Sequence, residues 1–263
     1  MLRSLCFLAA WAMVLSSHSA VAREIAVGFS ATTAPYVTSD EEMPGISVEI
    51  VREAFKLVGH DIKPVFQFFK RNEEEVRRGR LDAAPAPRKG RPGLHYSEPC
   101  IAYENVAVVR KLDKIPIKSL RDLPGHTVVA WQDAHDHLGG EFEQLFGEHV
   151  KDDYIRNYFD VANQEAQVRM FWSGRADIII IADVIFDYMT SKMADHFDTS
   201  VPLERHRIFG EPNVLSVAFN DPGLRDEFDE GLVKLRARGG IEKIYNKYRT
   251  HKPKKGAKTA KLE

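Results

Sequence analysis

The chain has 263 residues, 37 lysines and arginines against 38 aspartates and glutamates, and a formal net charge of -1. This balance argues against a nucleic-acid partner or an anionic membrane surface, because such partners favour a strongly basic face. The length is sufficient for one large or two modest hydrophobic cores.

The first 22 residues have the pattern of a secretory signal peptide. Arg3 precedes an apolar run that ends at Leu15, and the small residues Ala20, Val21 and Ala22 follow. The apolar run is shorter than the roughly 20 residues of a membrane span. We therefore expect cleavage after Ala22 and a mature protein that is free in the periplasm.

Cysteine usage limits how the mature fold is held together. Cys6 lies in the leader, in no lipoprotein-type setting, so we expect no lipid anchor. Removal of the leader leaves Cys100 as the remaining cysteine, which excludes an intramolecular disulfide. The fold must therefore be held by its core.

Short β-branched runs alternate with amphipathic helical patterns from Glu24 onward, which favours an α/β fold with largely parallel sheets. The spacing of apolar residues predicts a helix that ends at Gly59, a residue suited to the C-terminal end of a helix. Asn72 and Glu75 predict a capping box for the next helix. The elements expected in the first half are strand 24–30, helix 45–59, strand 61–68, helix 73–79, strand 81–86 and strand 104–111.

The alternating pattern restarts after a break at residues 111–125. A continuous apolar run within 176–182 predicts a strand that is buried on both faces. Asn163 is expected to cap the helix before it. The elements expected in this second half are strand 126–132, helix 138–150, strand 152–158, helix 163–174, strand 176–182, helix 183–193, strand 213–220 and helices 221–240 and 241–249.

The two halves are similar α/β units, with the last strand and two helices left over. These elements need a sheet to pack on, and a return to the first lobe supplies one. Two crossings, near 109–113 and near 206–212, would then join the lobes as a hinged clamp. The expected boundaries are a leader at 1–22, a first lobe at 23–109 plus 208–250, a second lobe at 110–207 and a disordered basic tail at 251–263.

Several stretches spread from Ile25 to about Arg249 carry a resemblance to a known family. They are Pro35-Tyr36 followed by GISVEIVREAF, then RRGRLDA, YSEP at 96–99, KSLRDLPGHTVVAWQ, SGRADIII and PGLRDEFDEGLVKLRARGGIEKIYNKY. In this order they resemble family 3 of the bacterial periplasmic solute-binding proteins, receptors that serve ABC importers of polar amino acids and related compounds. The resemblance implies a two-lobed clamp of the type II periplasmic binding protein kind, with two crossover segments and a ligand cleft between the lobes.

The resemblance also implies ligand contacts from the first lobe. Tyr36, after Pro35, stands where the family has an aromatic wall, and the alternative is a packing role. Phe69 and Arg71 stand at the end of the second strand, on the cleft side in the family. For Arg71 the alternative is an exposed surface arginine.

The family's carboxylate clamp is altered in this chain. Members that bind α-amino acids carry Thr-Pro-Glu-Arg after the Leu-Asp step, and the arginine pairs with the ligand carboxylate. Here the segment APAPRKGRPGLHYSEP at 84–99 is shorter and lacks that motif. Arg88 and Arg91 are the candidates for the role, although such a contact is geometrically demanding. The alternative is a solvated basic loop.

The corresponding turn of the second lobe is altered too. Family members usually read Gln-x-Gly-Thr or Gln-x-Gly-Ser there, whereas this chain reads WQDAHDHLGGEF from Trp131. Ala134 replaces the glycine and His135 occupies the hydroxyl position. Trp131, Gln132 and His135 remain candidates to line the cleft.

The third altered ligand-binding position is that of the aspartate with which family members bind the ligand amine. It normally lies five residues beyond the Arg-x-Asp step, whereas Asp183 lies six beyond Asp177. If the following helix keeps its register, Ala182 takes the amine-binding place and Asp183 becomes chiefly a helix cap. Asp183 is therefore a candidate ligand residue with a structural alternative.

These three departures make a plain α-amino acid a less favoured ligand, because an unpaired charged group in a closed cleft costs roughly 1.5 to 3 kcal/mol. We expect a monomeric periplasmic receptor that binds a small polar or anionic solute between its lobes and delivers it to an ABC permease. A membrane sensor is the alternative partner.

Metal binding and catalysis are two alternative functions. A metal site is suggested by a group of histidines and one aspartate, since imidazole and carboxylate suit zinc, copper or nickel. The group consists of His126, His135, Asp136, His137 and His149. The HDH spacing is too tight for both histidines to reach one ion, so we expect neither a metal nor a cofactor.

An enzyme of the dehydratase kind on the same fold would need a carboxyl group poised in the cleft. Glu42, Glu49 and Glu98 stand in no recognisable catalytic arrangement, and the chain has no nucleophile elbow, phosphate loop or complete dinucleotide fingerprint. We therefore expect a binding protein rather than an enzyme.

Overall fold

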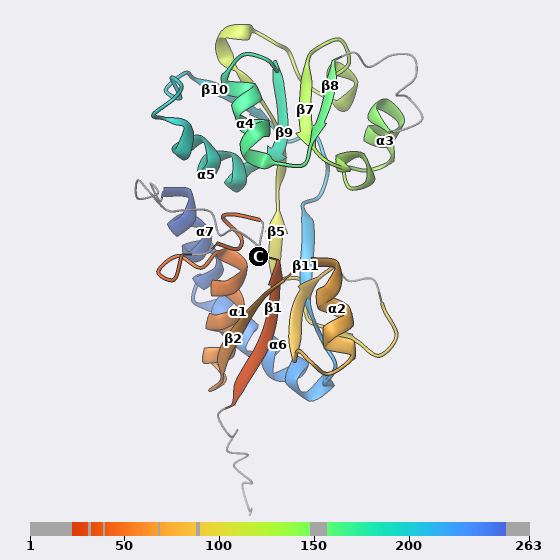
Figure 1. The fold of residues 1–263 in the computed structure, drawn as a ribbon, viewed down its shortest axis with the longest axis vertical. Coiled ribbons are helices and arrows are strands. Elements are labelled where there is room, and N and C mark those ends of the chain that lie inside the picture. Colours follow the sequence, from red (N-terminus) through yellow and green to blue (C-terminus); the bar gives the residue numbers. More distant parts are fainter. Residues whose placement is uncertain are drawn as a thin grey trace, which may run out of the picture.

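Two lobes, each a β-sheet covered by helices, are joined by two extended segments in the computed structural model (Figure 1). The structure describes residues 23–30, 33–38, 40–67, 69–87, 90–147 and 157–250. The two-lobed α/β clamp expected from the sequence is confirmed. The predicted leader at 1–22 and the predicted tail at 251–263 lie outside the described residues.

The first lobe is built on a sheet with the strand order β2-β1-β3-β11-β4, and β5 also pairs with β11. β1 is parallel to β2 and β3, and β11 is antiparallel to β3, β4 and β5. Its strands are β1 (Glu24–Ser30), β2 (Asp61–Gln67), β3 (Ala83–Ala86), β4 (His95–Tyr96), β5 (Ile101–Tyr103) and β11 (Asn213–Phe219). Its helices are α1 (Ile46–Lys56), α2 (Phe69–Arg77), α6 (Pro222–Ala237) and α7 (Gly240–Thr250).

The second lobe is built on a sheet with the strand order β10-β6-β9-β7-β8. β7 is parallel to β8 and β9, whereas β6 is antiparallel to β9 and β10. Its strands are β6 (Asn105–Arg110), β7 (Val128–Trp131), β8 (Tyr158–Val161), β9 (Ile178–Ala182) and β10 (Leu203–His206). Its helices are α3 (Gly140–Phe146), α4 (Gln164–Trp172) and α5 (Asp183–Met193), with short 3-10 turns η1 (Lys111–Asp113), η2 (Leu120–Asp122) and η3 (Ala134–Asp136).

The strand that follows the first crossing belongs to the second lobe. β6 pairs with β9 from Asn105 opposite Ala182 to Val109 opposite Ile178. The boundary expected near residue 109 therefore falls inside a strand of the second sheet. We propose lobes of 23–103 plus 213–250 and of 105–206, with crossings at residue 104 and at 207–212.

Other differences from the predicted elements are local. The sheets are mixed rather than largely parallel, because the strands that enter or leave a crossing run against their neighbours. α2 begins at Phe69, so Asn72 lies inside the helix and its Oδ1 accepts from Gln67 Nε2 at 2.7 Å instead of capping. β4, β5 and β10 were not predicted. Most of the strand predicted at 152–158 lies outside the described residues.

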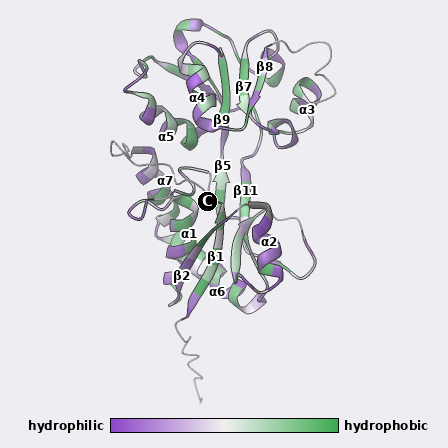
Figure 2. Ribbon diagram, viewed as in Figure 1, coloured by the Kyte–Doolittle hydropathy of each residue, from purple (hydrophilic) through white to green (hydrophobic). Residues whose placement is uncertain are grey.

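The predicted core positions are buried. β9 is buried along its whole length, and Figure 2 shows the central strands β7 and β9 as hydrophobic. Of the apolar face predicted for α1, Ile46, Ile50, Ala54 and Phe55 are inaccessible to solvent, whereas Val58 lies beyond the end of the helix and is only partly buried. Phe55 packs on Phe228 of α6 at a ring-centroid distance of 5.1 Å. Among the described residues, no helix has the length and apolar character needed to cross a bilayer.

Candidate functional site

A cavity of about 610 Å³ lies between the two lobes. The first lobe contributes Phe29, Ser30, Thr33, Val37, Ser47, Pro85, Tyr103, Asn213 and Leu215 to its lining. The second lobe contributes Asn105, Trp131, Gln132, Asp133, His137, Gln164, Ala182 and Ile185. A solute in this cavity would therefore contact both lobes.

The fold places the cavity at strand ends and helix starts. Ser30 ends β1, Trp131 ends β7 and Ala182 ends β9, while Gln164 begins α4. Ligands of open α/β sheets bind outside the carboxyl ends of the strands, where the chain turns into a loop or helix. The cavity occupies that position in both sheets.

The second-lobe turn after β7 contributes much of the polar lining. Trp131 and Gln132, both predicted, line the cavity. His135 does not, because η3 turns it into the lobe, where it is 7% exposed with Nε2 3.5 Å from Asp136 Oδ1. Its neighbours Asp133 and His137 line the cavity instead.

The aromatic side chains of the first lobe that line the cavity are Phe29 and Tyr103, not the predicted Tyr36. Tyr36 is 1% exposed, and its hydroxyl donates to the carbonyl oxygen of Ala102 at 2.6 Å. Its ring stacks on Tyr103 with centroids 4.0 Å apart. Tyr36 thus supports Tyr103 from behind. The sequence offered no motif at Tyr103, which ends β5, a strand too short to show a periodic pattern.

The Asp183 carboxylate is buried and paired with arginine. It is 3% exposed and pairs with Arg205, while Arg249 Nη2 of α7 lies 3.8 Å from its Oδ2. Arg205 also pairs with Asp187. The helix-cap role expected for Asp183 is wrong, since Ala182 is the N-cap residue of α5 and the Asp183 carboxylate accepts from Arg205, with no capping bond to the described helix. It is Ala182 that lines the cavity.

Because Asp183 is buried among arginines, we expect Asp183→Asn to lower the free energy of unfolding by about 1–2 kcal/mol. Denaturant unfolding followed by circular dichroism measures the change. Asp187→Asn is the matched control, because its more exposed carboxylate pairs with the same arginine. An Asp183→Asn protein as stable as the parent would contradict a stabilising ion pair.

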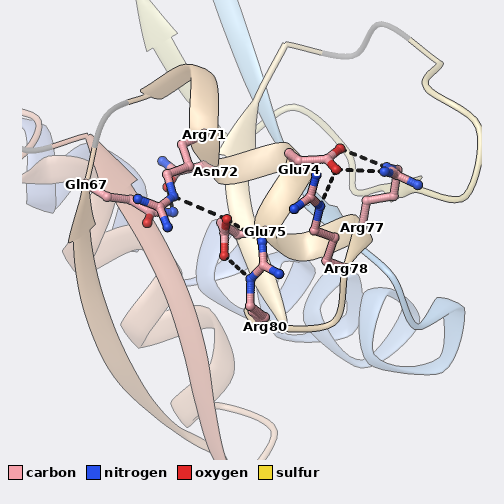
Figure 3. Close-up of polar contacts among 8 residues, drawn as sticks. All are labelled: Gln67, Arg71, Asn72, Glu74, Glu75, Arg77, Arg78 and Arg80. Atoms are coloured by element: carbon pink, nitrogen blue, oxygen red, sulfur yellow. Dashed lines mark hydrogen bonds and ion pairs between the residues drawn. The ribbon is translucent and has the colours of Figure 1, made fainter.

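Arg71 belongs to a surface ion-pair network on α2, shown in Figure 3. Its Nε lies 3.2 Å from Glu75 Oε1, and its side chain is 65% exposed. Hydrogen bonds from Arg80 and then Arg71 lower the pKa of Glu75 to about 2. Hydrogen bonds from Arg77 and then Arg78 do the same for neighbouring Glu74. Arg71 does not line the cavity.

Arg91, another predicted first-lobe contact, does not line the cavity either. Arg91 Nε lies 3.2 Å from Glu73 Oε2, and the arginine side chain is 52% exposed. Arg88 and the side chain of Phe69 lie outside the described part of the chain. None of the described lining residues is an arginine or a lysine.

The carboxylates considered for catalysis lie elsewhere. Glu49 accepts hydrogen bonds from Lys247 Nζ at 2.7 Å and from the Tyr248 hydroxyl. Neither Glu42 nor Glu98 lines the cavity. Within the described ranges, no group of three or more histidine, cysteine, aspartate or glutamate side chains is arranged to hold a metal ion. His149 lies outside those ranges.

Solved structures share this fold at low sequence identity. A histidine kinase sensor domain similar to periplasmic binding proteins is 20% identical, with a TM-score of 0.61 over 88% of this chain and 99% of its own. The arginine-, lysine-, histidine-binding protein of Geobacillus stearothermophilus is 17% identical, with a TM-score of 0.60 over 88% and 97%.

A third similar structure is the second substrate-binding domain of a putative amino acid ABC transporter from Streptococcus pneumoniae. It is 22% identical, with a TM-score of 0.60 over 86% of this chain and 100% of its own. No curated protein sequence matches the chain. The family model of the bacterial extracellular solute-binding proteins, family 3, matches residues 25–251. With this match over nearly all of the described fold and a cavity between two lobes, the chain belongs to family 3 of the bacterial extracellular solute-binding proteins.

Proposed function

We propose that this protein binds a small polar solute in the interlobe cavity and presents it to a membrane partner. The observation that carries the proposal is the cavity of about 610 Å³ lined from both lobes. That volume is in the usual range for small-molecule sites. A solute that contacts both lobes stabilises their approach, and this is how hinge closure is coupled to binding.

The proposed partner is the permease of an ABC importer, with delivery from the periplasm after removal of residues 1–22. The Streptococcus pneumoniae domain supports this partner, since it is a substrate-binding domain of a putative amino acid ABC transporter. A membrane sensor is the second candidate, favoured by the fold shared with a histidine kinase sensor domain. Pull-down of membrane proteins with ligand-loaded protein distinguishes a permease from a kinase.

The arginine contacts predicted for the solute are not found among the described residues that line the cavity. Instead, that lining combines the rings of Phe29, Tyr103 and Trp131 with polar side chains from both lobes. We propose that the rings enclose the apolar part of the solute and that the hydroxyl and amide groups orient its polar part. Binding without turnover is the proposed activity.

Trp131 supplies the readout that tests the proposal. It lines the cavity, whereas Trp172 is 9% exposed in the core of the second lobe. We expect titration of the mature protein with amino acids, amines and organic acids to change Trp131 fluorescence for those compounds that bind, with calorimetry as the independent measure of affinity.

The matched variants are Trp131→Phe and Trp172→Phe. The first should remove most of the fluorescence change, and the second should retain it. A compound that binds by calorimetry without changing Trp131 fluorescence would place its site elsewhere. Absence of saturable binding across the panel would contradict a small-solute receptor.

A further inference from the structure

Asp133 presents an unpaired carboxylate at the cavity. It is an acidic residue of the described lining, and its side chain has no hydrogen bond or ion pair within the described residues. Acidic groups near the cavity are otherwise engaged, such as Glu104 with Arg207 and Asp183 with Arg205. The protein therefore leaves one negative charge of the cavity wall without a described counter-ion.

The backbone holds this carboxylate in an uncommon conformation. Asp133 has φ 61° and ψ 20°, in the left-handed region, between the end of β7 and the turn η3. Side chains other than glycine cost free energy there, although aspartate and asparagine tolerate it better than most. Such a conformation at a ligand-facing position points to a functional role for the side chain. Glycine would relieve the backbone but would remove the carboxylate.

The surroundings of Asp133 suit a cation. None of the described lining residues is an arginine or a lysine, and Trp131 lies two positions before Asp133 on the same wall. Aromatic faces attract ammonium and guanidinium groups. A cationic group could thus meet a carboxylate and aromatic rings in one cavity, whereas an anionic group would meet Asp133 with like charge.

Closure of the lobes would strengthen the preference of the cavity for a cationic group over an anionic one. Asp133 is exposed to solvent in the present arrangement. Approach of the first lobe would remove water from the carboxylate, and a desolvated carboxylate without a partner is strongly disfavoured. A cation carried by the solute would supply that partner, so closure is favoured with a cationic solute and opposed with an anionic one.

We infer that Asp133 selects a solute with a net positive charge, whose ammonium or guanidinium group pairs with the Asp133 carboxylate beside Trp131. This inference rests on the proposed function, since it names the class of solute taken by the same cavity. It narrows the small polar or anionic solute expected from the sequence to a cationic one. Asp133 acts here as a specificity-determining residue and takes part in no chemical step.

The test compares probes of similar size and different charge by calorimetry with the full mature protein. Agmatine, arginine and putrescine are the cationic probes, glutamine is the uncharged-side-chain probe, and glutamate and glutarate are the anionic probes. We expect at least one cationic probe to bind and the anionic probes to bind at least tenfold more weakly. A charge-assisted contact is sufficient for such a difference.

Asp133→Asn is the decisive variant, because asparagine keeps the shape and tolerates the left-handed backbone. It should weaken cationic-probe binding by tenfold or more and leave the unfolding midpoint unchanged. Asp136→Asn is the matched control, a neighbouring exposed carboxylate outside the cavity lining, and it should leave affinity unchanged.

The outcomes separate the two proposals. Binding of an anionic or neutral probe in preference to all cationic probes, or cationic binding that is unaffected by Asp133→Asn, would overturn the role of Asp133 and leave the receptor function standing. Failure of every probe to bind would contradict both. Cationic preference that is lost in Asp133→Asn and kept in Asp136→Asn supports both.

Discussion

Gly231→Ala is expected to lower the free energy of unfolding by about 2–3 kcal/mol, at the upper part of the range for overpacking. Gly231 lies inside α6 where this helix crosses α1. A β-carbon at that position would lie 2.0 Å from the carbonyl oxygen of Ala54 and 2.8 Å from its carbonyl carbon. The contacted atoms belong to the backbone, so the two helices must move apart to accept the methyl group.

Helix propensity alone predicts that Gly231→Ala raises the free energy of unfolding. Alanine is favoured over glycine in a helix interior by about 1 kcal/mol. Denaturant unfolding followed by far-UV circular dichroism decides between the two effects. Gly223→Ala in the first turn of α6 is the matched control, because its added carbon meets only Asp221 Oδ1, at 3.3 Å. A Gly231→Ala protein that is as stable as the parent would show that the helix crossing is not tight.

Alkaline unfolding between pH 10 and about 12 is the second large effect that we expect. Burial is the first cause that raises the pKa of Tyr36, Tyr103, Tyr245 and Tyr248, and the pKa of Tyr245 rises to about 12. In the unfolded chain these phenols ionise near pH 10. Above that pH the unfolded state binds fewer protons than the native state, so stability falls as pH rises.

The size of this loss of stability follows from the rise in pKa on folding. For Tyr245, the rise from 10 to about 12 corresponds to roughly 3 kcal/mol of unfolding free energy. The contribution is complete below pH 10 and is lost as the pH approaches the folded-state pKa. Several buried tyrosines act together, so their combined loss is comparable with a typical stability of 5–15 kcal/mol. Phenolate absorbance and circular dichroism, recorded together from pH 8 to 13, should change in one transition.

Tyr158→Phe isolates the tyrosine contribution from the titration of lysines. The Tyr158 hydroxyl is buried without a hydrogen-bond partner in the described structure, and burial raises its pKa. Its removal should leave stability at pH 7 unchanged or higher and move the alkaline midpoint upward. Native tyrosines that ionise near pH 10 with circular dichroism unchanged would contradict the expected coupling.

Several features of the fold were predictable from the sequence because they depend on local patterns. The apolar run of β9 and the amphipathic face of α1 each follow from the spacing of neighbouring residues. Asn163 caps α4 as predicted, with its Oδ1 accepting from Ala166 N at 3.0 Å. The order of such elements was enough to predict a two-lobed clamp. Short strands such as β4, with two residues, contain no period to detect.

The candidate site was only partly predictable. Trp131 and Gln132 lie at the end of a recognisable strand, and both line the cavity. The rotation of the next turn, which buries His135 and exposes Asp133, depends on a backbone conformation that residue order does not reveal. The wall formed by Tyr103 depends on Tyr36, 67 positions earlier in the chain.

By itself, the sequence determined the class of fold, the order of its main elements and the family, because hydrophobic periodicity and short motifs are properties of neighbouring residues. The tertiary structure alone decided that β6 joins the second sheet, that Asp183 pairs with Arg205 and approaches Arg249, and that Asp133 faces the cavity. These features depend on contacts between segments distant in the chain or on the rotation of one turn. An apolar strand can pair in either sheet, and a carboxylate can face a solute or a nearby arginine, until packing selects one arrangement.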